Sequence, residues 1–156
     1  MLRKQNLVTS VIILAVFVLA LACARKNEST FAQIGKQFGF ATTTGFADVH
    51  CHSWSYTTPL EGWSRTRITL VKTYARTEAI DGFFKAFSNR TDIVEMPETP
   101  VVDSTYTDEV PWWNPRQLRT YRYLRCDLAQ HARQGRLEAY VGREAEHNVL
   151  YLIAYQ

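Results

Sequence analysis

The sequence predicts an α+β fold: an N-terminal membrane anchor or signal segment, then one domain with a mostly antiparallel sheet of four to six strands and one main amphipathic helix. Three observations predict it. An apolar run opens the chain, a stripe with helical periodicity lies in the middle, and two strand-like segments close it. The 156 residues are 46% hydrophobic and 13% aromatic, which suffices for one packed core and excludes general disorder.

Residues 1–24 form the predicted signal or anchor segment. The apolar run within it covers residues 7–24, and these 18 residues are longer than most signal-peptide cores and close to the length of a spanning helix. Two basic residues lie on each side of the run: Arg3, Lys4, Arg25 and Lys26. The free amino terminus adds a charge to the first pair, so we expect the N-terminus inside and the domain outside the cytoplasm.

Near the end of the run, a small residue precedes a cysteine. Ala20-Leu21-Ala22-Cys23 resembles the lipobox of bacterial lipoproteins, with Ala20 and Leu21 in the reverse of the usual order. The resemblance implies that Cys23 is lipidated and becomes the new N-terminus. Four readings of the run stay open: an uncleaved anchor helix, a lipoprotein, a cleaved and secreted protein, and a buried core helix.

Residues 25–47 are predicted to be a polar tether, because they mix charged residues, Ser, Thr and three glycines. Phe31, Ile34 and Phe38 recur there at the spacing of a short helix. This apolar stripe either rests on the membrane surface or packs against the domain.

A single α+β domain is predicted over 48–156. Its first clear strand covers 66–74, where β-branched residues dominate. A helix follows, with its N-cap at Thr77 and its end near Asn89. The core-facing stripe of that helix has the spacing i, i+3, i+4, i+7: Ile80, Phe83, Phe84 and Phe87.

The rest of the domain is predicted to be mainly strands. A short strand over 93–96 is ended by proline, and a strand over 120–126 is followed by a short helix over 127–135. A hairpin with strands over 137–143 and 149–155 closes the chain. Both faces of the last strand are apolar, which is typical of a central strand.

The His50-Cys51-His52 triplet has metal-ligand character. Side chains alternate along a strand, so Asp48, His50 and His52 are expected on one face. Two imidazoles and a carboxylate suit zinc or another transition metal with one open position. The alternative is a pair of polar histidines near the start of the domain that bind no metal.

Cys51 and Cys126 are an even pair in a chain predicted to be exported, which favours a disulfide between them. This bond would close a loop of about 75 residues and stabilise the fold by roughly 4.5 kcal/mol in the chain-entropy model. Two alternatives stay open: separate buried thiols, and a thiolate nucleophile at Cys51 flanked by histidines.

Trp112 and Trp113 are the candidate binding surface. Neighbouring side chains on extended chain point to opposite sides, so we expect one of the two to be exposed. The alternative is that these aromatic residues plug the end of the sheet.

Charge is segregated along the second half of the chain. Residues 91–115 hold six acids and no Lys or Arg, whereas residues 116–143 hold seven arginines. The two segments either neutralise each other or face a charged partner. Apart from Arg3 and Lys4, the chain has 16 basic and 15 acidic residues, so we expect no nucleic-acid partner.

The function expected from these observations is binding. The sequence has no Ser–His–Asp signature, glycine-rich phosphate loop or dinucleotide fingerprint, which disfavours an enzyme and predicts no cofactor. We expect a small membrane- or lipid-anchored protein of a bacterial envelope, with a non-catalytic extracytoplasmic domain that binds a protein or an envelope polymer. Two alternatives stay open: a metal-binding protein or enzyme centred on His50 and His52, and an accessory subunit of a membrane protein complex.

Overall fold

The computed structural model describes residues 2–42, 44–58, 64–88, 93–94, 106, 109–115, 118–128 and 135–156. For 2–11, 58, 64, 93–94, 119–121 and 127–128 it describes the backbone alone. Two helices and six strands make up this part of the chain.

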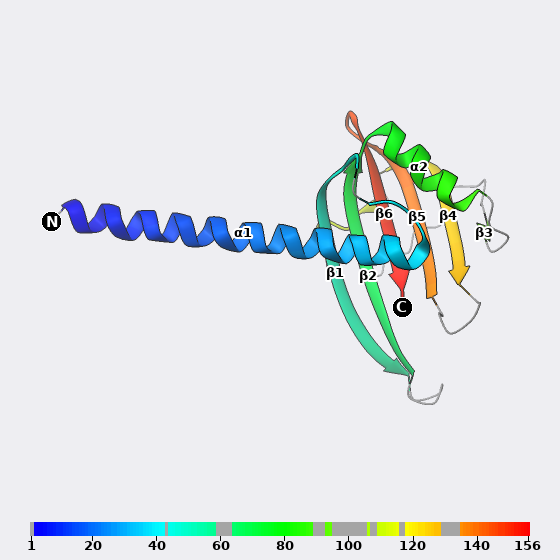
Figure 1. Ribbon diagram of the computed structural model, residues 1–156, viewed down its shortest axis with the longest axis horizontal. Helices are drawn as coiled ribbons and strands as arrows, with labels where there is room; N and C mark the ends of the chain where they lie inside the picture. The colour runs from blue at the N-terminus through cyan, green and yellow to red at the C-terminus, as the bar shows by residue number, and fades with distance from the viewer. Residues whose placement is uncertain are drawn as a thin grey trace.

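One antiparallel sheet carries the domain (Figure 1). Five long strands and the two-residue β3 lie in the order β1-β2-β6-β5-β4-β3, and every neighbouring pair is antiparallel. The strands are β1 Phe46–Thr58, β2 Ser64–Ala75, β3 Ile93–Val94, β4 Arg119–Leu128, β5 Gly135–Glu144 and β6 His147–Tyr155. The predicted α+β class and antiparallel sheet are confirmed.

The closing hairpin is formed by β5 and β6. Glu144 pairs with His147, so the turn has only two residues and is shorter than predicted. Its first residue, Ala145, has a φ of 55°, in the left-handed region that two-residue hairpin turns require. β6 lies between β2 and β5, and residues 149–154 are all buried. Its central position explains why both of its faces are apolar.

α1 is a single helix over Leu2–Phe38 and includes most of the predicted tether. Phe31, Ile34 and Phe38 are each 1% exposed and belong to the main core of the domain. The segment 25–47 therefore differs from a polar tether, because its apolar stripe packs on the domain. Gly39, with a φ of 82°, ends the helix and donates its N–H to the carbonyl of Gly35 at 2.7 Å.

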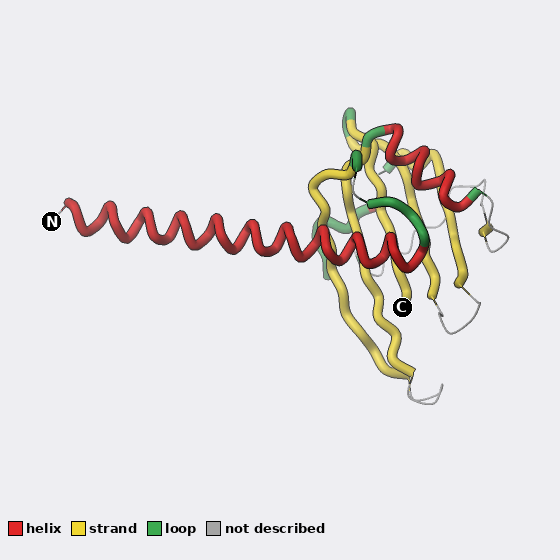
Figure 2. Tube along the Cα trace, in the orientation of Figure 1, coloured by secondary structure: helices red, strands yellow, loops and turns green. Residues whose placement is uncertain are grey.

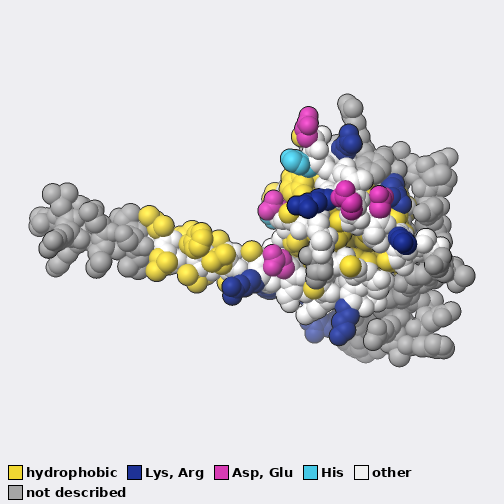
Figure 3. Space-filling view, turned by 45° about the horizontal axis from the view of Figure 1, so that its top comes forward, with side chains coloured by type: hydrophobic (Ala, Val, Ile, Leu, Met, Phe, Trp, Pro, Cys, Tyr) yellow, Lys and Arg dark blue, Asp and Glu magenta, His cyan; other side chains and the backbone are white. Residues whose placement is uncertain are grey.

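The N-terminal half of α1 projects away from the sheet (Figure 1). Hydrophobic side chains cover its described part, and charged ones begin where the helix meets the domain (Figure 3). Eight large hydrophobic residues there are 47–65% exposed: Ile12, Ile13, Leu14, Val16, Phe17, Val18, Leu19 and Leu21. Among the residues described, no helix combines the length and apolar character needed to cross a membrane. The anchor predicted over 1–24 is not confirmed.

α2 covers Thr77–Phe87 and buries the predicted stripe of Ile80, Phe83, Phe84 and Phe87. Its start differs from the prediction. The N-cap is Arg76, which makes no side-chain capping bond. Thr77 is the first helical residue, and its hydroxyl accepts a hydrogen bond from the Asn148 amide at 3.3 Å. The helix is therefore fixed by its buried stripe and by this bond to the start of β6. Asn89, the predicted end of the helix, lies outside the described residues.

The two faces of the sheet are covered differently. Figure 2 shows α1 and α2 lying on one side of the strands. On this helix face, α1 and α2 pack on aliphatic strand residues such as Val71, Leu137 and Leu152. The opposite aromatic face buries Tyr123, Tyr140, Tyr151 and Trp113, with Trp54, Tyr74, Tyr106, Trp112 and Tyr155 packed around them.

The region between α2 and β5 was predicted only in part. β4 extends to Leu128, so residues 127–128 continue the strand and do not begin the helix predicted over 127–135. The structure describes two residues, Ile93–Val94, of the strand predicted over 93–96. The rest of both segments, apart from Gly135 at the start of β5, lies outside the described residues.

Candidate functional site

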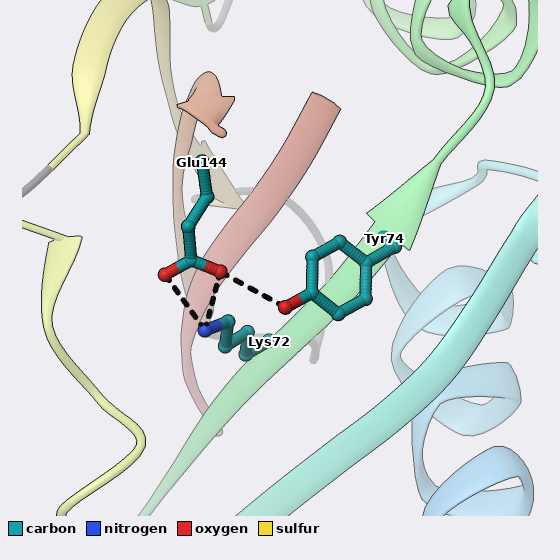
Figure 4. Close-up of polar contacts among 3 residues, drawn as sticks. All are labelled: Lys72, Tyr74 and Glu144. Carbon is teal, nitrogen blue, oxygen red and sulfur yellow. Dashed lines mark hydrogen bonds and ion pairs between the residues drawn. The ribbon is translucent and has the colours of Figure 1, made fainter. Parts of the chain in front are cut away.

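A polar cluster lies on the aromatic face, where β2 meets the closing hairpin (Figure 4). Lys72 Nζ donates to Glu144 Oε1 at 3.0 Å and lies 2.8 Å from Oε2. The Tyr74 hydroxyl donates to Oε2 at 3.0 Å. Lys72 and Tyr74 are two residues apart on β2 and share a face, and the β2–β6–β5 pairing brings Glu144 beside them.

Burial and hydrogen bonding fix the charges of this cluster. Burial by itself lowers the pKa of Lys72, but the interactions with Glu144 and with the Tyr151 side chain together outweigh it, so the pKa lies above its ordinary value. Burial by itself raises the pKa of Glu144, but the bonds from Lys72 and Tyr74 outweigh it and lower the pKa. The hydrogen bond to Glu144, followed by burial, raises the pKa of Tyr74. At neutral pH the cluster holds an ammonium, a carboxylate and a neutral phenol, none of them suited to proton transfer.

Two buried polar atoms lie next to this cluster. Trp113 and Tyr151 are fully buried, with ring centroids 5.0 Å apart and ring planes at 78°. The Trp113 indole N–H and the Tyr151 hydroxyl have no hydrogen-bond partner of normal geometry in the described part of the chain. Lys72 Nζ lies 5.4 Å from the Tyr151 ring centroid, within the range of a cation–π contact. The cluster thus stabilises a face that is otherwise packed with aromatic rings.

The predicted metal ligands do not come together. A bulge interrupts β1 between Ala47 and His50, and Asp48 has a φ of 51°. The bulge breaks the alternation from which a shared face was expected. His50 and His52 stay on the aromatic face, with ring centroids 5.7 Å from Trp112 and 5.6 Å from Trp54, whereas Asp48 lines a groove against α1. No group of three His, Cys, Asp or Glu residues in the described ranges is placed to hold a metal ion.

The predicted disulfide is also absent. The described residues include three cysteines, and all three are free thiols: Cys23, Cys51 and Cys126. Three strands separate β1 from β4, which places Cys51 and Cys126 about 19 Å apart at about 4.8 Å per strand step. A disulfide needs Cα atoms within about 7 Å. The Cys51 thiol instead donates to the carbonyl of Asn27 on α1 at 3.4 Å.

The Cys51 thiol is unsuited to nucleophilic chemistry. Burial raises its pKa to about 12, so the thiol stays protonated at neutral pH, whereas the thiolate is the reactive form. Cys23 is exposed on the projecting half of α1, and its lipidation stays a prediction.

The two adjacent tryptophans have different roles. Trp113 is fully buried and packs against Tyr151 on the aromatic face. Trp112 is half-buried, and its ring centroid is 5.7 Å from that of His50. The part of the predicted binding surface that remains available is therefore Trp112.

Arg122 of the basic segment has its partners on α2. The Arg122 guanidinium lies 3.5 Å from the Phe84 ring centroid, and its Nη1 is 3.2 Å from Asp81 Oδ1. Both partners are on α2 and not in the acid-rich segment 91–115, most of which lies outside the described residues.

Two surface hollows bring together residues that sequence reasoning did not group. A groove of about 460 Å³ lies between α1 and the start of β1, with Arg25, Glu28 and Asp48 among its lining residues. A more open hollow of about 650 Å³ is lined by Ser53, Trp54, Ser55, Arg65 and Arg67. Neither hollow has a sequence motif, because each joins residues from elements that meet only in the fold.

The described candidates are thus a fixed ion-pair cluster, a surface formed by the exposed His50 and the half-buried Trp112, and a charged groove beside α1. None of them assembles a nucleophile, a base and an oxyanion-stabilising group in the described part of the chain. Comparisons of the chain with protein-family models, with curated proteins and with solved structures find no match.

Proposed function

We propose that this chain is a small membrane-anchored protein that presents one non-catalytic α+β interaction domain on the extracytoplasmic side. One observation carries the proposal. α1 is a single helix whose residues 12–21 expose large hydrophobic side chains, while Phe31, Ile34 and Phe38 on the same helix lie in the core of the domain.

The distribution of the exposed residues supports insertion into lipid. Residues 12–14 and 16–19 are consecutive large hydrophobics, so they surround the helix, which turns once every 3.6 residues. A helix that is apolar on all sides is stable only when it is covered all round. Lipid satisfies this condition for a run of 18 residues, and the run begins at Leu7, before the first described side chain.

The rest of the molecule supports a binding role. Cys51 is a protonated buried thiol, and Lys72 and Glu144 are held by each other. Among the described residues other than tyrosines, these are the groups whose pKa values are shifted. In each case the shift comes from burial or from a structural hydrogen bond. The half-buried Trp112 and the exposed His50 form an aromatic surface. Tryptophan is enriched in protein interfaces.

Membrane fractionation of the full chain tests the proposal. We expect the wild-type protein to float with membranes and to resist alkaline extraction. The double variant Leu14→Arg/Val18→Arg is expected to be extracted, because each central arginine opposes insertion by about 3 kcal/mol. Gln33→Arg, at an exposed position of the same helix beyond the run, is the matched control and should stay bound.

Two further readouts define the attachment and the side. External protease should degrade the domain in spheroplasts without lysis. The intact mass distinguishes a full-length spanning helix from a chain that starts at a lipidated Cys23. Soluble wild-type protein, or a domain that is protected until lysis, would contradict the proposal.

A further inference from the structure

The continuous helix constrains how the domain meets a bilayer. α1 crosses the strands and reaches β1 first (Figure 1). The backbone carbonyl of Asn27 accepts a hydrogen bond from the Cys51 thiol of β1 at 3.4 Å. Gln37, ten residues further along α1, contacts Gln156 just beyond the end of β6. β1 is therefore the strand nearest to the projecting half of α1, and the sheet extends away from it.

The separation along the helix is short. The apolar run ends at Ala24, three residues before Asn27, which is about 4.5 Å at a rise of 1.5 Å per residue. The headgroup layer on each side of a bilayer is about 5–7 Å thick. If residues 7–24 lie in lipid, the first turn of α1 after the run and the start of β1 lie among the headgroups.

The groove between α1 and β1 lies at this level. It measures about 460 Å³ and carries one cation, Arg25, and two carboxylates, Glu28 and Asp48. In the described part of the chain, none of these three side chains forms an ion pair. Asp48 is held at a φ of 51° in the β1 bulge, and an aspartate there places a carboxylate in the groove at the cost of backbone strain.

We propose that this groove binds the headgroup of a zwitterionic aminophospholipid of the membrane that anchors the chain; the inference rests on the proposed membrane anchoring. Arg25 and the Ser29 hydroxyl suit the phosphate. Glu28 and Asp48 suit the primary ammonium, which can donate three hydrogen bonds. A quaternary ammonium cannot donate these bonds, and an anionic glycerol headgroup meets two carboxylates, so the groove selects phosphatidylethanolamine.

The test uses the full chain in nanodiscs of equimolar phosphatidylethanolamine, phosphatidylcholine and phosphatidylglycerol. The protein is then extracted in mild detergent, and its retained lipids are quantified by mass spectrometry. We expect phosphatidylethanolamine to be enriched about tenfold, the effect of one charge-assisted hydrogen bond. Glu28→Gln/Asp48→Asn should remove the enrichment, and Arg25→Gln should lower the retention of all three lipids.

The variants are chosen to keep the fold. All three residues are exposed, and asparagine tolerates positive φ as well as aspartate does. Glu78→Gln, an exposed carboxylate of α2, is the control and should leave the enrichment unchanged. Equal retention of the three lipids, or enrichment that survives the double variant, overturns the inference. A chain that does not enter nanodiscs overturns both the inference and the anchor, whereas a chain that enters without selectivity overturns the inference alone.

Discussion

The helix face and the aromatic face of the sheet stabilise the same strands by different means. On the helix face, aliphatic residues and phenylalanines pack together, and the buried hydroxyls have partners: Thr69 bonds Ser53 at 2.9 Å, and Thr73 bonds the Ala47 carbonyl at 2.7 Å. On the aromatic face, Trp113 and Tyr151 each bury a polar atom with no partner of normal geometry among the described residues.

The two faces therefore differ in how completely their buried polar groups are hydrogen-bonded. The helix face resembles an ordinary core, in which burial is the main source of stability. The aromatic face combines large rings with the Lys72–Glu144 ion pair and with unsatisfied polar atoms. Polar groups left unpaired in a buried site oppose stability, so equivalent substitutions on the two faces should differ in sign or size.

The largest expected effect concerns the helix face. Phe38→Ala removes a ring that is 1% exposed and should lower the free energy of unfolding by about 3–5 kcal/mol. Phe17, on the projecting half of the same helix, is 62% exposed, so Phe17→Ala should change the free energy of unfolding by less than about 0.5 kcal/mol. Denaturant unfolding of the detergent-solubilised chain measures both. Equal effects would mean that the end of α1 is not part of the core.

The next effect concerns the ion pair of the aromatic face. The pKa of Glu144 is lowered in the folded state, so its contribution is present above its unfolded pKa of about 4.3 and is lost as pH falls through the folded value. Glu144→Gln should lower stability by about 1–2 kcal/mol at pH 7.

The pH dependence provides the check. The gap between wild type and Glu144→Gln should narrow as the pH falls below about 4.3, where the carboxylate protonates. Glu146→Gln, in the exposed turn nearby, is the control and should be neutral. A gap that stays constant from pH 7 to pH 3 would show that the carboxylate charge contributes nothing.

The smallest effect compares one hydroxyl on each face. Thr73→Val removes a hydroxyl that donates to the Ala47 carbonyl and should lower stability by about 1 kcal/mol. Tyr151→Phe removes a buried hydroxyl without a partner of normal geometry and should be neutral or stabilising by up to about 1 kcal/mol. Thermal unfolding of the two variants measures the contrast. A loss at Tyr151 as large as that at Thr73 would mean that the two faces are equally well satisfied.

Sequence reasoning was most successful where a short-range pattern carries the information. The apolar stripe of α2 and the two apolar faces of β6 each lie within one element, and both predictions are confirmed. The proposed sites depended on longer-range pairing. A disulfide between Cys51 and Cys126 was predicted from their even number, but the strand order places them far apart. Asp48 was grouped with His50 by alternation, and a one-residue bulge redirected it.

The sequence by itself determined the α+β class, the antiparallel closing hairpin and the buried face of α2, because hydrophobic periodicity and turn chemistry act over a few residues. Only the tertiary structure decided that residues 25–38 continue α1 into the core, that Lys72 meets Glu144, and that Arg25, Glu28 and Asp48 share one groove. Strand order and the path of a helix across a sheet depend on how distant segments share one core. No local pattern in the chain encodes that arrangement.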